Sequence, residues 1–170
     1  FRMLYGTTVG AVANRTTLYD AEVNVVETYE PVSSARGAKK AADFVGLCDA
    51  FSIPIVTFTN VRGYKATKCS EANMAKAAAK LTYAFASATA PKVNVITGEA
   101  FGSAYLTMNS KSVGADLVYA WADAKIGMMD AKAAAKIMYA GADGAVIKEK
   151  ADEYDALQNS LESAGRRGYV

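Results

Sequence analysis

The part of the sequence that decides the fold is residues 50–60, AFSIPIVTFTN, together with residues 100–105, AFGSAY. In each, apolar and β-branched residues predict a buried strand that runs into a turn of small residues. A small-residue turn that opens a helix presents backbone N–H groups without partners, which can stabilise negative charge on a carbonyl oxygen. The sequence contains no histidine. A reaction that needs no proton acceptor from the protein therefore suits this chain.

Strand and helix patterns alternate on both sides of these segments. Helix, proline and strand occur twice in succession, with Pro54 and Pro91 about 37 residues apart, which is a weak internal repeat. The first helix pattern places Cys48 and Phe51 on its buried face. The alternation predicts an α/β domain with a mainly parallel sheet, whose sites lie at the carboxyl ends of the strands. Strands are expected at 8–14, 23–29, 55–59, 93–96, 117–120 and 126–129, and helices at 34–51, 74–88, 102–110, 132–139 and 148–164.

Composition limits the class of protein. With 170 residues, 52% of them hydrophobic, the chain is expected to form one domain over residues 1–170. The net charge of +2 is spread along the sequence, which argues against nucleic-acid binding. No segment can insert directly into a membrane, and Cys48 in a helix and Cys69 in a loop make a poor disulfide framework. We expect a cytoplasmic protein. The sequence does not begin with Met, and it leaves open whether the chain is a fragment of a longer polypeptide.

The residue types exclude several common chemistries. Without histidine, Ser–His and Cys–His nucleophile pairs and histidine metal sites cannot form, and we predict no metal site. Walker A and GxGxxG patterns do not occur. Ser103 is a conceivable nucleophile, but the glycines of the nucleophile elbow are missing around it, which disfavours a hydrolase. Close packing of a helix on a sheet is an alternative reason for small residues in these turns.

A family resemblance covers most of the chain, from Val9 to about Tyr139. The matching blocks are 44–57 FVGLCDAFSIPIVT, 79–85 AKLTYAF, 88–93 ATAPKV, 100–105 AFGSAY, 114–116 GAD and 119–121 YAW. In order and spacing they resemble the C-terminal half of the biotin-dependent acyl-CoA carboxyltransferases. That family includes the propionyl-CoA carboxylase β subunit and the carboxyltransferase subunits of methylmalonyl-CoA and glutaconyl-CoA decarboxylases.

The resemblance implies a crotonase-like fold, an α/β superhelix of ββα units. It implies that the active site lies between the N-half of one subunit, which binds a coenzyme A thioester, and the C-half of another, which binds biotin. Backbone N–H groups that hold the ureido oxygen of biotin would belong to Ser103 and Ala104, with Gly102 permitting the turn. Asn60, Val61 and Gly63 would lie in the loop that lines the biotin pocket.

The same resemblance implies the partners and the reaction. The partners would be a CoA-side carboxyltransferase domain, a biotin carboxyl carrier protein and further copies of the chain in a homo-oligomer. The reaction would move a carboxyl group between biotin and an acyl-CoA, with biotin itself accepting the α-proton, so that the protein orients the reactants and stabilises charge.

The sequence departs from the family at several positions. Residues 60–64 read NVRGY where the family usually has Asp-Val-Pro-Gly-Phe, and residues 73–78 lack the usual glycine and histidine. Ser103 replaces the second glycine of Tyr-Gly-Gly-Ala, and residues 130–132 replace Gly-Pro-Glu. Two alternatives therefore stay open. One is a non-catalytic structural or assembly paralogue. The other is a stand-alone crotonase-like acyl-CoA enzyme, although acid–base carboxylates are not evident on the turns.

Overall fold

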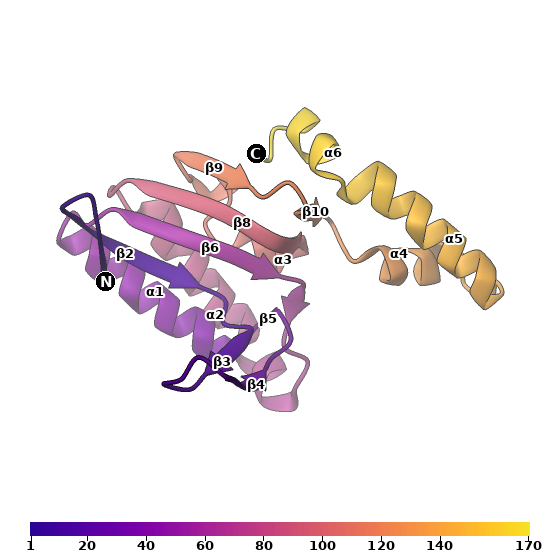
Figure 1. Ribbon diagram of the computed structural model, residues 1–170, viewed down its shortest axis with the longest axis horizontal. Helices are drawn as coiled ribbons and strands as arrows, with labels where there is room; N and C mark the ends of the chain where they lie inside the picture. The colour runs from indigo at the N-terminus through magenta and orange to yellow at the C-terminus, as the bar shows by residue number, and fades with distance from the viewer.

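The computed structural model describes residues 1–170, and its centre is a mainly parallel sheet (Figure 1). Three strands run side by side in the order β2 (Thr7–Ala13), β6 (Ile55–Val61) and β8 (Lys92–Phe101). Two short strands share the far edge of β8, with β9 (Leu117–Ala120) along its beginning and β10 (Lys125–Gly127) along its end. In this sheet only β1 (Arg2–Leu4) is antiparallel, to β2. The predicted α/β class and parallel sheet are confirmed.

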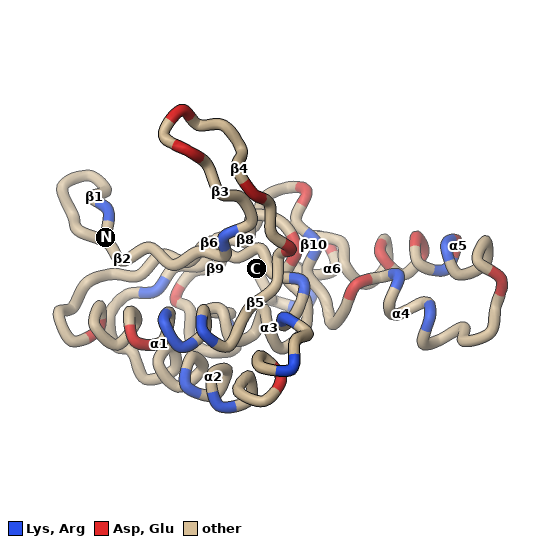
Figure 2. The backbone as a smooth tube through the Cα atoms, turned by 90° about the horizontal axis from the view of Figure 1, so that it is seen from below, with Lys and Arg blue, Asp and Glu red and all other residues tan.

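Helices α1 (Ala35–Ala50) and α2 (Lys68–Ser87) cover one face of the sheet, as Figure 2 shows. Each begins at a hydroxyl cap, where Ser34 accepts from the N–H of Gly37 and Thr67 from that of Ser70. Apolar residues at helical spacing face the strands and are buried in a single core. Its fully buried large side chains include Val45, Ile55, Leu81, Phe85 and Ile96.

The weak internal repeat is visible in the strand register. Ile55, which follows Pro54, lies opposite Lys92, which follows Pro91, in the parallel β6–β8 pair. The two units are also joined at their helix ends, because the carboxylate of Asp49 accepts from the backbone N–H groups of the segment before β8. Those hydrogen bonds lower the pKa of Asp49. The repeat therefore places two equivalent helix–strand units side by side.

The opposite face of the sheet has no helices. A hairpin of β3 (Thr17–Tyr19) and β4 (Val25–Thr28) projects on that side (Figure 2). The large side chains Phe58, Leu117 and Tyr119 alternate along β6 and β9 with residues that face the helices, and they are exposed. The only tryptophan, Trp121, follows in the same alternation and is exposed too. We call Phe58, Leu117, Tyr119 and Trp121 the bare sheet face.

Beyond β10 the chain forms an arm that projects from the sheet (Figure 1). The arm contains α4 (Ala131–Met138), α5 (Gly144–Tyr154), the π-helical turn η2 (Asp155–Asn159) and α6 (Leu161–Arg166). The single helix predicted over 148–164 is therefore wrong. It breaks because the buried Asn159 packs over Gly127 and donates to the carbonyl of Met129, while Ser160 is extended and caps α6. The return of α6 buries Ala164 in the main core.

Other boundaries differ from the sequence prediction for local reasons. The strand predicted at 93–96 continues to Phe101, since β8 pairs first with β9 and then with β10. Phe51 is 70% exposed rather than buried, because α1 has ended and the chain reverses through Ser52, which has a φ of 51°. Cys69 lies in the first turn of α2, not in a loop.

Four further elements complete the description. The helix predicted over 102–110 is α3 (Gly102–Leu106), followed by a single 3₁₀ turn, η1 (Lys111–Val113). Two-residue strands, β5 (Val32–Ser33) and β7 (Gly63–Tyr64), pair in parallel and join the segments that lead into α1 and α2. No helix has the length and apolar character needed to cross a membrane.

Candidate functional site

A hollow of about 390 Å³ lies where three chain segments meet beyond the ends of parallel strands. The segments are β7 with the residue before it, the turn from β8 into α3, and the link from β10 to α4. Ligand sites in parallel sheets form at this edge because loops from neighbouring strands converge there. We call this space the strand-end hollow. It is lined by Arg62, Gly63, Tyr64, Phe101, Gly102, Ser103, Ala104, Met128, Met129, Asp130 and Ala133.

Gly102 makes the abrupt turn from β8 into α3 possible. Its φ of +59° is in the left-handed region, which side chains disfavour. A Cβ at this position would also lie 2.9 Å from the carbonyl oxygen of Met128. The turn therefore needs glycine for two reasons, its backbone conformation and the close approach of the β10–α4 link.

The first turn of α3 lines the hollow and has no side-chain cap. The first N–H groups of an α-helix have no partner within the helix. Every other α-helix of the chain has a side chain that caps these groups, whereas α3 has none. Ser103 and Ala104 lie in this turn, so their N–H groups are the candidates for binding an oxygen atom that carries negative charge.

Side chains around the hollow do not form an acid–base pair. The hydroxyl of Ser103 is exposed and makes no hydrogen bond, so nothing activates it as a nucleophile. Asp130 caps α4 by accepting from the N–H of Ala133 at 3.1 Å. Burial raises the pKa of Tyr105, in the same helix, to about 12, so its hydroxyl loses its proton even less readily than that of an ordinary tyrosine. The arrangement suits charge stabilisation rather than proton transfer.

The residues predicted to bind biotin separate into two groups. Gly63 lines the hollow with Gly102, Ser103 and Ala104. Asn60 and Val61 do not, since they belong to β6. Val61 is fully buried, and the amide oxygen of Asn60 accepts from the N–H of Glu99 at 3.1 Å.

The first of the two predicted strand-to-helix turns is therefore wrong. After Asn60 the chain continues through Val61 and Arg62 into β7, and α2 begins only at Lys68. The register of the β6–β8 pair shifts between Thr59 and Val61. Beyond this shift the chain enters β7, which pairs with β5. Of the two predicted turns, only the one after β8 leads directly into a helix.

Sequence reasoning missed a polar cluster buried beneath the strand ends. Asn94 on β8 accepts from the hydroxyls of Thr57 and Thr59 on β6 at 2.9 and 2.8 Å. Asn109, which follows α3 and has a φ of 56°, donates to Thr57 at 3.2 Å and ties the segment after α3 to the sheet. Polar residues at alternate positions of the two strand segments were the available signal, because a buried polar side chain needs a hydrogen-bond partner.

The known proteins similar to this chain share both its sequence and its fold. A family model described as the carboxyl transferase domain matches residues 1–167. The propionyl-CoA carboxylase beta chain of Roseobacter denitrificans is 36% identical over 173 residues, covering 100% of this chain and 32% of that protein. A transcarboxylase 12S crystal structure, a hexamer with methylmalonyl-coenzyme A and methylmalonic acid bound, is 36% identical with a TM-score of 0.78, covering 82% of this chain and 28% of its own.

A more distant structure supports the fold alone. The geranyl-CoA carboxylase β subunit of P. aeruginosa superimposes with a TM-score of 0.76 at 20% identity, covering 95% of this chain and 30% of that one. With these neighbours, the α/β architecture is that of the crotonase-like carboxyltransferases. The chain belongs to the acyl-CoA carboxyltransferase family, as its sequence resemblance predicts. It spans about a third of the length of the curated relatives that it matches.

Proposed function

We propose that this chain is the biotin-side part of an acyl-CoA carboxyltransferase, and that the strand-end hollow receives the ureido ring of biotin. The observation that carries the proposal is the uncapped first turn of α3, the only α-helix start without a side-chain partner. A ureido oxygen gains negative charge when the carboxyl group leaves the ring, and aligned N–H groups stabilise such charge. Biotin, attached to a carrier protein, would supply the carboxyl group.

The properties of the hollow fit such a ring. Its volume of about 390 Å³ is within the range of small-ligand sites. Apolar side chains from Phe101, Met128 and Met129 surround the polar turn, so that the ring can pack while its oxygen is held. A partner that binds the CoA thioester would complete the site, because this hollow alone provides one set of N–H donors. The direction of transfer and the acyl group depend on that partner.

Carrier binding tests the biotin assignment directly. We expect the chain to retain a biotinylated carrier domain in a pull-down and to release the same carrier without biotin. Gly63→Trp should abolish this difference, since space is open around Gly63 and the indole would fill the hollow. Gly46→Trp is the matched control, because Gly46 also has open space but lies on the exposed side of α1. If the chain retained the carrier equally with and without biotin, or if Gly63→Trp and Gly46→Trp lost binding equally, the strand-end hollow would not be the biotin site.

A second candidate is a non-catalytic assembly subunit of the same family. Arg62, at a position where the family usually has proline, forms a bidentate ion pair with Glu99 at the edge of the hollow, with both N–O distances 2.9 Å. Glu99 raises the pKa of Arg62 through these hydrogen bonds. These two charged side chains at the edge of the strand-end hollow would narrow the opening through which the uncharged ureido ring of biotin enters. Both carboxylate oxygens of Glu99 are engaged in this ion pair, so Glu99 is not free to act as an acid–base group. A stand-alone acid–base enzyme is therefore the least supported of the three candidate functions.

Self-association is a further expectation for this chain. The bare sheet face exposes four large apolar side chains on one face of the sheet, with Phe58 on one side of β8 and Leu117, Tyr119 and Trp121 on the other, and exposed apolar surfaces mark protein interfaces. We expect light scattering at micromolar concentration to give a mass above that of one chain, and Tyr119→Glu to lower it. Tyr83→Glu, on the exposed side of α2, is the control and should leave the mass unchanged. A monomeric wild-type chain would contradict homo-oligomer formation.

A further inference from the structure

The β3–β4 hairpin is a small two-stranded sheet that nothing in the chain covers. Figure 2 shows it projecting from the face of the main sheet that has no helices. Every residue from Tyr19 to Glu30 is exposed. A two-stranded hairpin with no buried face is only marginally stable in water, because a stable sheet needs a hydrophobic face that packs against another layer. The hairpin therefore gains stability when a partner covers it.

The exposed side chains of the hairpin are apolar and acidic. Tyr19 on β3 lies opposite Val25 on β4, and both are exposed, as are Val23 in the turn and Val26. Residues 16–30 contain four carboxylates and no lysine or arginine. A partner that fits this surface needs apolar side chains to cover the valines and positive charge to meet the carboxylates.

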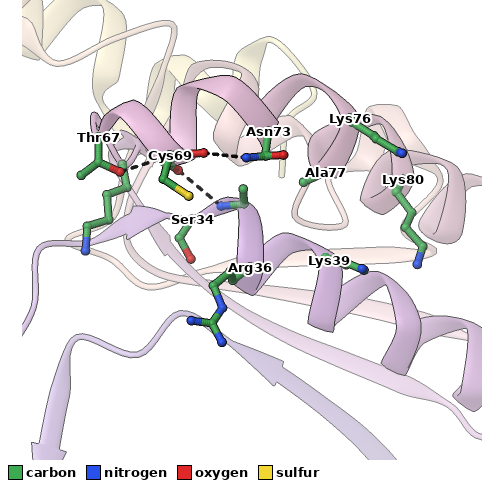
Figure 3. A pocket seen from close by; sticks show the side chains of 12 residues that line it. Ser34, Arg36, Lys39, Thr67, Cys69, Asn73, Lys76, Ala77 and Lys80 are labelled. Atoms are coloured by element: carbon green, nitrogen blue, oxygen red, sulfur yellow. Dashed lines mark hydrogen bonds between the residues drawn. The ribbon is translucent and has the colours of Figure 1, made fainter.

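A cavity of about 770 Å³ between the first turns of α1 and α2 offers both (Figure 3). We call it the α1–α2 groove. Small apolar side chains from Ala35, Cys69 and Ala77 line it, and no carboxylate does. Its cations that form no ion pair are those of Arg36, Lys39, Lys65 and Lys76. The groove is therefore complementary to the hairpin in charge and in apolar surface.

The hairpin and the groove lie on opposite sides of the main sheet. In Figure 2 the hairpin, with its acidic residues, points away from the two helices along which Lys and Arg gather. A hairpin that points away from the groove of its own chain can reach only the groove of another copy. Contact between two hairpins is disfavoured, because both are acidic and like charges repel. The complementary contact is therefore head-to-tail, with a different surface used by each of the two copies.

We propose that the β3–β4 hairpin of one copy docks in the α1–α2 groove of a second copy of this chain. The carboxylates of the hairpin then meet the unpaired cations of the groove, and the valines near its tip cover the small apolar side chains there. The docked hairpin gains the covering layer that it lacks in a single chain. The contact uses no residue of the bare sheet face or of the strand-end hollow. It is therefore independent of the function proposed for the hollow.

An exchange of charges between the two surfaces tests the contact. All chains carry Tyr119→Glu, so that the bare sheet face does not contribute. We expect sedimentation at micromolar concentration to show association that weakens as salt is raised. Glu22→Lys with Glu27→Lys in the hairpin, or Lys39→Glu with Lys76→Glu in the groove, should each weaken association about tenfold or more, because like charges then meet. An equal mixture of the two double variants should associate again, since a basic hairpin then meets an acidic groove.

The mixture separates a lost contact from a lost fold, because a chain that does not fold cannot be rescued by a second variant. Glu149→Lys and Lys111→Glu are the controls, since both side chains are exposed and lie outside the two surfaces, and they should leave association unchanged. The proposal is overturned if the Tyr119→Glu chain stays monomeric, if the controls weaken association equally, or if the mixture fails to associate.

Cross-linking places the hairpin in the groove. Copies with Ala21→Cys in the hairpin turn and Cys69→Ser are mixed with copies that keep Cys69, which is exposed and lines the groove. Cys48 is fully buried and burial raises its pKa, so it should not react. We expect a short bismaleimide to join the two kinds of copy. Ala140→Cys in place of Ala21→Cys is the control, because Ala140 is also exposed but lies on the arm. Equal cross-linking from both positions would refute docking in the groove.

Discussion

Ser103→Pro is expected to lower carboxyl transfer by the complete assembly about 10²–10³-fold, as removal of a single oxyanion-hole donor does in other enzymes. Proline has no N–H, so the change deletes one of the two donors assigned to the ureido oxygen. It should fit the structure, because Ser103 lies in the first turn of α3, where proline is tolerated since the N–H groups there have no partner within the helix. The serine side chain is exposed, and the ring therefore displaces no packed neighbour.

The measurement is the turnover rate of variants with equal thermal unfolding by circular dichroism. Ser103→Ala keeps the N–H and loses the hydroxyl, so it should retain most of the activity. Ala104→Pro is a less direct test, because Ala104 is 1% exposed within the core and a larger ring there would disturb packing. A fully active Ser103→Pro assembly, or an inactive Ser103→Ala assembly, would show that the backbone N–H is not the group that matters.

The isolated chain should show no carboxyl transfer to any acyl-CoA, and addition of a cognate CoA-side domain should restore it. The strand-end hollow contains one uncapped helix start and no acid–base pair, so a thioester oxygen has no second set of donors. An assay of malonyl-CoA or methylmalonyl-CoA formation, with and without the CoA-side domain, decides the question. The CoA-side domain alone is the control. Product formation by this chain alone would refute a site divided between two domains.

The parts of the fold that follow from local sequence were predictable. Proline after each of two amphipathic helices, at matching positions, sets the start of a strand, and Pro54 and Pro91 do lie next to aligned strand starts. The turn at Gly102 also follows from sequence, because an apolar run ending in small residues must change direction. These features depend on a few neighbouring residues, which the sequence displays directly.

The parts that depend on distant contacts were not predictable. The break at Ser160 depends on Asn159 fitting over Gly127, which lies far earlier in the chain. The extension of β8 to Phe101 depends on two separate partner strands. The groove between α1 and α2 was missed because its cations come from segments that the sequence separates, and only the packing of the two helices brings them together.

Because any side chain at position 102 would be crowded, the presence of glycine there carries little information about whether a related protein has kept its activity. Any side chain there would meet the carbonyl of Met128 at 2.9 Å and require a disfavoured φ, so folding alone selects glycine in an active enzyme and in an inactive descendant alike. Ser103 is free of that restriction, since its side chain is exposed. Glycine at position 102 therefore does not distinguish active relatives from inactive paralogues. A changed residue at position 103 does not indicate that activity has been lost.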